Sequence, residues 1–198
     1  MKRGRNTIGR VVAYHGCDLK IAKKLLNHDI DIASSTNQYD WLGDGAYFWI
    51  DTPKRAIDWA IWKKERGHIT TPAVIGAFIY PGLCLNLCDY GVMDSVRDAY
   101  ARLKLLFDAT GTPLPVNKTE RDGVSMERFL DCAVFNMLHN IRAANGDDPY
   151  DSVVGIFEEG PFVFPGASFR DKTHIQIAII NPECIIGYFQ VRGYEIFR

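Results

Sequence analysis

The chain has 198 residues, a formal net charge of −1, 47% hydrophobic residues and 24% charged residues. This length is enough to bury a full core, and we expect one domain over residues 1–198. The near-neutral charge argues against a protein that binds nucleic acids or membrane surfaces indiscriminately. A local basic group stands at the N-terminus, where we interpret it as a solvated chain end: Lys2, Arg3, Arg5 and Arg10.

The five cysteines are scattered along the chain. Only Cys84 and Cys88 are close together, and no further Cys or His follows them at the spacing of a zinc site. We therefore expect reduced thiols and no metal site. No long apolar run follows the basic start, so we expect no signal peptide and no membrane span. These features predict a cytoplasmic protein.

The first third of the chain predicts two strand–helix units. Asp18 suits the N-cap of the first helix, and Thr52-Pro53 places a proline at the first position of the second. Arg66-Gly67 is typical of a helix end. The expected elements are a strand at residues 10–15, a helix to about residue 27, a polar loop at 33–40, a strand at 46–50 and a helix from 53 to 66.

The rest of the chain predicts two amphipathic helices between strands. One buried strand ends at Pro81-Gly82, and Asn181-Pro182 joins the last two strands. Because strands come at both ends with helices between them, the order predicts an α+β domain and not a regular βαβ alternation. The expected elements are strands at residues 73–80, 152–157, 174–180 and 185–191, helices at 93–108 and 125–144, and a long loop at 160–172.

Two short motifs carry the chemical information: Tyr14-His15-Gly16, and then Gly43-Asp44-Gly45-Ala46-Tyr47-Phe48. The second motif is not a dinucleotide-binding fingerprint, because Phe48 replaces the third glycine and the glycines lead into a strand. It is not a phosphate-binding Walker A loop either, since no Gly-Lys-Ser/Thr follows it.

Together these motifs resemble the ADP-ribosyltransferase superfamily, in the branch with a His-Tyr-Glu-type triad that includes diphtheria toxin and the poly-ADP-ribose polymerases. The run Tyr39-Asp40-Trp41-Leu42 before Gly43 and the strand His174-Ile175-Gln176 are similar to uncharacterised bacterial members. The resemblance implies an α+β fold with a split antiparallel β-sheet and flanking helices. It also implies that NAD is the substrate and that no metal is needed.

The resemblance implies a catalytic set of His15, Tyr47 and Gln176. The His15 ring would donate a hydrogen bond to a ribose hydroxyl, and Tyr47 would stack on the nicotinamide ring. The alternatives are a core-edge histidine and a core aromatic of a half-buried strand. Gln176 stands where the family has a glutamate, so it would hold a ribose hydroxyl without supplying a negative charge. Glu158 and Glu159 are back-up carboxylates, and their alternative is a solvated turn.

Further residues would contact NAD. The exposed backbone of Gly16 would pair with the nicotinamide carboxamide, because a ligand can approach a glycine closely. Trp59 would close the aromatic stack or belong to the core, and Arg55 stands where the polymerases have a small hydroxyl residue for the carboxamide. The implied NAD-binding set is Tyr14, Gly16, Gly45, Arg55 and Trp59.

The loop at residues 160–172 corresponds to the target-recognition loop of the family. Its phenylalanines would contact a target or pack the loop down. The implied target-side residues are His174, Phe169 and Arg170. Cys17, beside Gly16, is expected to be a small buried residue and not a reactive thiol.

The resemblance therefore implies an NAD-dependent mono-ADP-ribosyltransferase that modifies a macromolecular acceptor, either a protein or a nucleic acid. A toxin-like role with a neutralising antitoxin-like partner would fit this class. Two alternatives remain open from the residues. An NAD glycohydrolase would use the same residues with water as the acceptor, and a catalytically silent module would only bind NAD or ADP-ribose.

Overall fold

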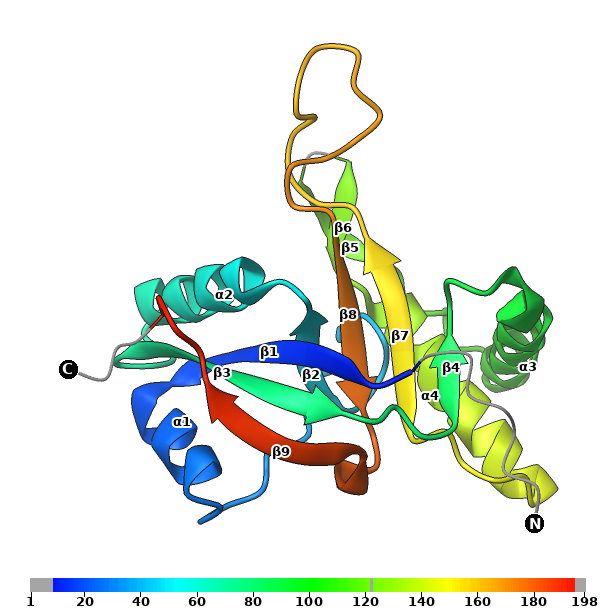
Figure 1. The fold of residues 1–198 in the computed structure, drawn as a ribbon. Helices are drawn as coiled ribbons and strands as arrows, with labels where there is room; N and C mark the ends of the chain where they lie inside the picture. Colours follow the sequence, from blue (N-terminus) through cyan, green and yellow to red (C-terminus); the bar gives the residue numbers. More distant parts are fainter. Residues whose placement is uncertain (1–8, 122, 195–198) are drawn as a thin grey trace.

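A computed structural model describes residues 9–121 and 123–194, so the basic residues Lys2, Arg3 and Arg5 lie outside the described part. Figure 1 shows the order of the elements. The strands are β1 Val11–Asp18, β2 Ala46–Ile50, β3 Pro72–Ile79, β4 Cys84–Asn86, β5 Lys118–Arg121, β6 Val124–Glu127, β7 Ser152–Phe157, β8 His174–Ile179 and β9 Ile185–Gln190. The α-helices are α1 Leu19–Leu26, α2 Pro53–Glu65, α3 Met93–Thr110 and α4 Phe129–Asn145, and short 3-10 turns span Tyr90–Val92 and Pro182–Cys184.

Seven strands form one sheet in the order β4-β7-β8-β2-β1-β3-β9, and β5 pairs with β6 as a separate hairpin. The fold is α+β, as the sequence predicts. Only β4 and β7 run parallel, whereas the other neighbours in the large sheet are antiparallel. The two halves of the sheet meet at β1 and β2, which are joined by only two residue pairs, Ala13↔Ile50 and Tyr14↔Trp49. The sheet is therefore nearly divided at this seam.

Each face of the sheet is covered by different helices (Figure 1). Phe48 and Trp49 are neighbours on β2, so their side chains point to opposite faces. Phe48 belongs to the cluster that includes Leu25 of α1, while Trp49 packs in the cluster that includes Ala56 of α2. Helices α3 and α4 pack on each other and cover the sheet near β7 with a third cluster. The alternation of the strands thus sorts the apolar residues into separate layers.

The helix boundaries follow the local signals in the sequence. Asp18 is the N-cap of α1, and Pro53 is the first residue of α2. Gly111 and Gly146 follow α3 and α4 with φ of 67° and 73°. This left-handed conformation is common after a helix and favours glycine, which has no Cβ. The expected helix ends are confirmed to within a few residues.

Two short features depart from the sequence prediction. The helix expected at 125–144 begins only at Phe129, because Val124–Glu127 forms strand β6 of the hairpin. Strand β4 has three residues and was not expected. Both strands are too short for a period of two to stand out from a helical period in the sequence.

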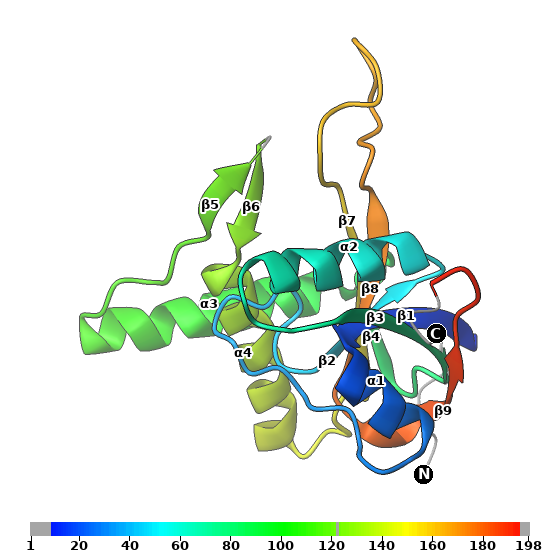
Figure 2. The ribbon, with the colours of Figure 1, turned by 90° about the vertical axis from the view of Figure 1, so that its left-hand side faces the viewer.

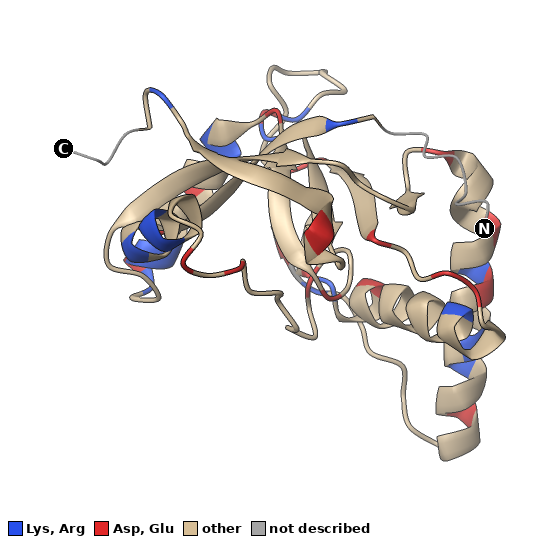
Figure 3. Ribbon diagram, turned by 60° about the horizontal axis from the view of Figure 1, so that its bottom comes forward, with Lys and Arg blue, Asp and Glu red and all other residues tan. Residues whose placement is uncertain are grey.

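Charged residues of both signs are interspersed over the ribbon in Figure 3. On α3 they form three ion pairs within the helix, Arg97–Asp94, Arg102–Asp98 and Lys104–Asp108. Such exposed pairs contribute little to stability. They do, however, leave α3 without a one-signed surface that would attract a polyanion.

Replacing Asp18 with Ala is expected to destabilise the N-terminal unit. The Asp18 carboxylate accepts hydrogen bonds from the backbone N–H groups of Lys20, Thr70 and Thr71, so it caps α1 and holds the segment before β3. These bonds lower the pKa of Asp18. Losing an N-cap costs about 1 kcal/mol. Urea unfolding at pH 7 should show a loss of this order for Asp18→Ala and a smaller loss for Asp18→Asn, which can still accept a hydrogen bond.

Candidate functional site

The three catalytic residues predicted from the sequence lie on neighbouring central strands. His15 is on β1, Tyr47 on β2 and Gln176 on β8, and these strands are adjacent in the order β8-β2-β1. Tyr14 is paired with Trp49, and Trp49 is paired with Gln176. Directly paired residues project from the same face of a sheet. The face that carries Gln176 therefore also carries Tyr47, Trp49 and Tyr14, whereas His15 projects from the opposite face beside Phe48.

His15 lies at the seam between β1 and β2. Its Nδ1 is 2.8 Å from the Tyr47 carbonyl oxygen, and its ring centroid is 5.5 Å from that of Phe48. A carbonyl only accepts hydrogen bonds, so Nδ1 carries the proton. Burial lowers the pKa of His15 to about 4, which leaves the ring neutral at pH 7 with Nε2 as an acceptor. The expectation that this ring donates to a ribose hydroxyl is therefore corrected, because its remaining nitrogen accepts.

The Tyr47 hydroxyl is bonded within the turn that precedes its own strand. It donates to the Gly43 carbonyl at 2.6 Å and accepts from the Leu42 N–H at 2.9 Å. Burial raises the pKa of this hydroxyl above its usual range. Tyr47 thus fixes the glycine turn and is only partly buried. The ring retains some exposed surface, while the hydroxyl already has both a donor and an acceptor partner.

The two glycines assigned to NAD have structural partners in this fold. A Cβ on Gly16 would overlap the carbonyl oxygen of Ala56, so α2 packs directly on the β1 backbone. Gly45 exchanges both backbone hydrogen bonds with Ser35, at 2.8 and 3.0 Å. The expectation of an exposed Gly16 backbone is corrected, because this residue is buried beneath a helix. Tyr14, in turn, meets Phe189 edge-on with a centroid distance of 6.2 Å.

His174 and Gln176 form a buried polar pair on β8. His174 Nδ1 is 2.7 Å from the Lys172 carbonyl and therefore donates to it, and the Gln176 side-chain N–H donates to His174 Nε2 at 2.9 Å. The two residues are only 4% and 8% exposed. Burial lowers the pKa of His174 to about 4, with Arg55 and Arg128 adding to the effect. His174 is therefore neutral at pH 7.

Glu159 is a buried member of the same site. Its carboxylate accepts a hydrogen bond from Arg55 Nη2 at 2.9 Å, and the two side chains are only 12% and 14% exposed. The same oxygen is 3.7 Å from His174 Nε2. The alternative of a solvated turn carboxylate is therefore wrong for Glu159, although Glu158 is exposed. Arg55 and Glu159 are far apart in the sequence, and no local pattern connects them.

Aromatic side chains surround this polar group. The rings of Trp41, Trp49 and Phe157 lie 5.9–6.5 Å from the His174 ring, measured between centroids. Trp49 also approaches Trp59 of α2 at 6.1 Å. The buried Trp49 indole N–H has no hydrogen-bond partner. Buried donors are normally satisfied in folded proteins, so this indole N–H is an exception in the described part of the chain.

The outer side of α2 extends the aromatic group. Trp59 and Trp62 are stacked at 4.7 Å with an angle of 9° between the rings. The guanidinium group of Arg66 lies over the Trp62 ring, 3.9 Å from its centroid. Trp59 is one-third exposed and touches Trp49. It therefore belongs neither wholly to the core nor to an open pocket.

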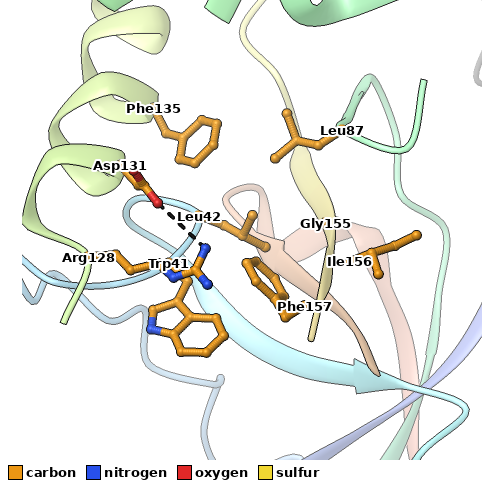
Figure 4. Close-up of a pocket in the computed structure, with 9 residues that line it drawn as sticks. All are labelled: Trp41, Leu42, Leu87, Arg128, Asp131, Phe135, Gly155, Ile156 and Phe157. Carbon is orange, nitrogen blue, oxygen red and sulfur yellow. Dashed lines mark ion pairs between the residues drawn. The ribbon is translucent and has the colours of Figure 1, made fainter. Parts of the chain in front are cut away.

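A cavity of about 220 Å³ lies behind the Trp41–Phe157 wall (Figure 4). Arg128 stands in this wall, 4.1 Å from the Trp41 ring and 4.9 Å from the Phe157 ring. It also pairs with Asp131 at 3.5 Å. The sequence analysis did not single out Arg128, because its importance depends on residues far away in the chain. The lining residues are Trp41, Leu42, Leu87, Arg128, Asp131, Phe135, Gly155, Ile156 and Phe157.

A second cavity of about 400 Å³ shares part of this lining. It lies between the β5–β6 hairpin, the start of α4 and the end of β7, and Arg170 from the loop at 160–172 also lines it. Figure 2 shows the hairpin and this loop projecting in the same direction. The lining residues are Asn117, Gly123, Val124, Ser125, Arg128, Asp131, Ile156, Phe157, Glu158 and Arg170.

The loop at 160–172 is held by contacts within itself. Arg170 donates to the Gly160 carbonyl at 2.7 Å and lies over the Phe162 ring at 4.5 Å. Phe162, Phe164 and Phe169 are 54–72% exposed. The alternative that these rings pack the loop onto the core is therefore wrong. They form an exposed apolar tip, a feature typical of surfaces that contact a partner.

Three further possibilities concern a reactive cysteine, a metal site and a membrane-spanning helix. Cys17 is buried, and burial raises its pKa to about 12, so it is not a nucleophile at neutral pH, as expected. Within residues 9–121 and 123–194, no three His, Cys, Asp or Glu side chains group in a way that could hold a metal ion. Among the described helices, none combines the length and apolar character needed to cross a bilayer.

The chain is similar to an uncharacterised protein of the archaeon Methanocaldococcus jannaschii. The two are 24% identical over 194 residues, which span 89% of this chain and 85% of the archaeal protein. No family model matches the chain, and no solved structure matches it significantly. The archaeal protein is itself uncharacterised, so this similarity assigns no activity.

Proposed function

We propose that this protein is an NAD-dependent mono-ADP-ribosyltransferase that modifies a macromolecular acceptor. The observation that carries the proposal is the adjacency of β1, β2 and β8. It brings together the Tyr-His-Gly, Gly-x-Gly-x-Tyr-Phe and His-x-Gln segments, which are far apart in the sequence. The seam between β1 and β2 lies at the centre of this group.

In this proposal each side chain has a defined task. His15 Nε2, which lies at the β1–β2 seam on the opposite face of the sheet from Gln176, accepts a hydrogen bond from one ribose hydroxyl, and the Gln176 amide turns from His174 to hold the hydroxyl next to the reacting carbon. Tyr47 and Trp59 offer aromatic surface to the nicotinamide. The unpartnered Trp49 N–H offers a hydrogen bond to a ligand oxygen.

The reaction breaks the bond between the ribose C1′ and the nicotinamide nitrogen. Nicotinamide leaves with the bonding electron pair, and the acceptor's nucleophilic atom forms a new bond to C1′ and loses its proton. Positive charge develops at C1′ as nicotinamide leaves. Glycosidases stabilise a similar charge with carboxylates. Because Gln176 has no charge, we expect slow transfer of a single ADP-ribose and not growth of a polymer.

We place the acceptor on the side of the 400 Å³ cavity. Arg170 lines that cavity and comes from the loop that presents the exposed phenylalanines. Arg128 also lines that cavity and lies over the Trp41 and Phe157 rings, which in turn lie beside His174. These residues, with His174, would meet the acceptor. Near-neutral overall charge favours recognition of a specific acceptor over electrostatic capture.

A catalytically silent module that binds NAD or ADP-ribose is the second candidate. The observation in its favour is the Gln176 side chain, which is engaged with the buried, neutral His174. A glycohydrolase is the enzyme alternative, with water in place of the acceptor. Labelled NAD distinguishes the three functions. A transferase moves the label to an acceptor, a glycohydrolase releases it as free ADP-ribose, and a silent module leaves NAD intact.

The test is incubation with NAD labelled on the adenylate phosphate, with and without cell lysate. We expect label on a lysate protein or nucleic acid, with transfer reduced about tenfold or more in Tyr47→Ala and His15→Ala. Tyr90→Ala and His68→Ala change exposed residues and should transfer normally. Tyr47→Phe separates the ring from its hydroxyl bonds, because it keeps the stacking surface and loses the contacts to residues 42 and 43.

The outcomes separate the candidates. Free ADP-ribose without acceptor labelling would indicate the glycohydrolase. All four tryptophans lie in the chain between residues 41 and 62, at or next to the site, so their fluorescence reports on binding. A fluorescence change on NAD addition without turnover would indicate the silent module, and neither binding nor turnover would contradict the proposal.

A further inference from the structure

The site has a carboxylate that the proposed catalytic set does not use. Gln176 stands where the family that the chain resembles has a glutamate, and Glu159 lies one side chain away from it. We propose that Glu159 supplies the negative charge that Gln176 lacks. This inference rests on the proposed transferase function and names a further residue for it.

Two hydrogen bonds, from Arg55 and from Lys172, hold Glu159 beside His174. Its carboxylate pairs with Arg55 at 2.9 Å and lies 3.7 Å from His174 Nε2, the atom that accepts from Gln176 at 2.9 Å. Its backbone carbonyl accepts from the Lys172 N–H at 3.1 Å, so the two ends of the 160–172 loop are tied together at this residue. Glu159 is 9% exposed and therefore little screened by water.

Burial strengthens the electrostatic interaction of the Glu159 carboxylate with nearby charges. Two charges 4 Å apart interact several times more strongly near a protein surface than in bulk water, and a buried group interacts more strongly still. The group between Glu159 and Gln176 is the neutral imidazole of His174, which carries no charge that would cancel the field. Arg55 offsets part of the charge, because it contacts the same Glu159 oxygen and its Nε lies 3.4 Å from His174 Nδ1. Glu159 thus lowers the energy of the positive charge that develops at C1′ as nicotinamide leaves.

A structural role for Glu159 makes a different prediction. If the carboxylate served only to neutralise the buried Arg55, removing both charges together would restore the site. Breaking a buried ion pair at one end is costly, whereas replacing both partners with apolar or neutral groups is often tolerated. The double substitution Arg55→Met with Glu159→Gln therefore distinguishes a partner of Arg55 from a charge that the reaction needs.

The experiment measures NAD turnover by the full chain, as the wild type and as four variants. We expect Glu159→Gln to lower kcat about 100-fold with a smaller change in KM for NAD. The double variant Arg55→Met with Glu159→Gln should stay as slow, although its stability recovers. Adding Gln176→Glu to Glu159→Gln should return at least about tenfold in kcat, because it restores one negative charge at the reacting carbon. Glu65→Gln, an exposed change at the end of α2, is the matched control.

Two results would overturn the inference while the proposed function survives. Wild-type turnover that Glu159→Gln leaves intact would show that the charge is not used. Recovery of kcat in the double variant with Arg55→Met would assign Glu159 to neutralising Arg55. If the wild type neither binds nor turns over NAD, the proposed function fails and the inference fails with it. Melting curves of every variant identify those that lose activity by unfolding.

Discussion

Lowering the pH from 7 to 5 is expected to destabilise this protein by about 2 kcal/mol for each of His15 and His174. Burial lowers the pKa of both residues to about 4 in the folded state, whereas an unfolded histidine titrates near 6.5. Below pH 6.5 the unfolded chain therefore binds protons that the folded chain does not. Folding stability falls as the pH falls through this window and levels off for these groups below about pH 4.

The measurement is urea unfolding at pH 7, 6 and 5 for the wild type and for His15→Gln and His174→Gln. Each substitution should lower the loss of stability between pH 7 and pH 5 by about 2 kcal/mol, whatever it does to the stability at pH 7, because the comparison is made within each variant. His68→Gln, a change at an exposed position, is the control substitution. A wild-type slope that survives in both buried variants would contradict the assignment.

Replacing Gly16 with Ala is expected to cost about 3 kcal/mol of stability, since the added methyl group has no space. The new Cβ would overlap the Ala56 carbonyl oxygen, which belongs to the backbone of α2 and cannot rotate away. The helix would have to move as a unit and would take Arg55 and Trp59 with it. For a chain of this size, such a loss corresponds to a fall in Tm of roughly 6–12 °C.

Gly187→Ala is the matched control for this prediction. It is also a strand glycine, on β9, and a Cβ there would meet nothing within 4 Å. Its Tm should change little. A Tm of Gly16→Ala equal to that of the wild type would show that α2 does not pack directly on the β1 backbone at Gly16. The same result would restore Gly16 as a residue whose backbone a ligand can approach.

Most of the fold could be predicted from local signals in the sequence. Asp18 and Pro53 mark where α1 and α2 begin, because an N-cap and an N-terminal proline act on their own first turn. The central strands follow from β-branched and aromatic runs, since these side chains suit a pleated, half-buried surface. The β5–β6 hairpin and β4 were missed because three or four residues do not establish a period.

The candidate site was predictable only in part. The motifs identify His15, Tyr47 and Gln176, and the strand order places their strands side by side. The sequence also indicates that position 16 needs a glycine, but a packed helix and an approaching ligand impose the same requirement. Only the tertiary structure shows that helix α2 occupies the space beside the Gly16 backbone.

The sequence by itself determined the element types, the α+β class and the residues that carry the resemblance, because each depends on side chains within a few positions of one another. The tertiary structure alone decided which distant groups meet. It paired Glu159 with Arg55, bonded His15 to the Tyr47 carbonyl and enclosed His174 with Gln176. Burial and long-range contacts set the charge state and bonding direction of a polar group, and neither is encoded in the spacing of residues along the chain.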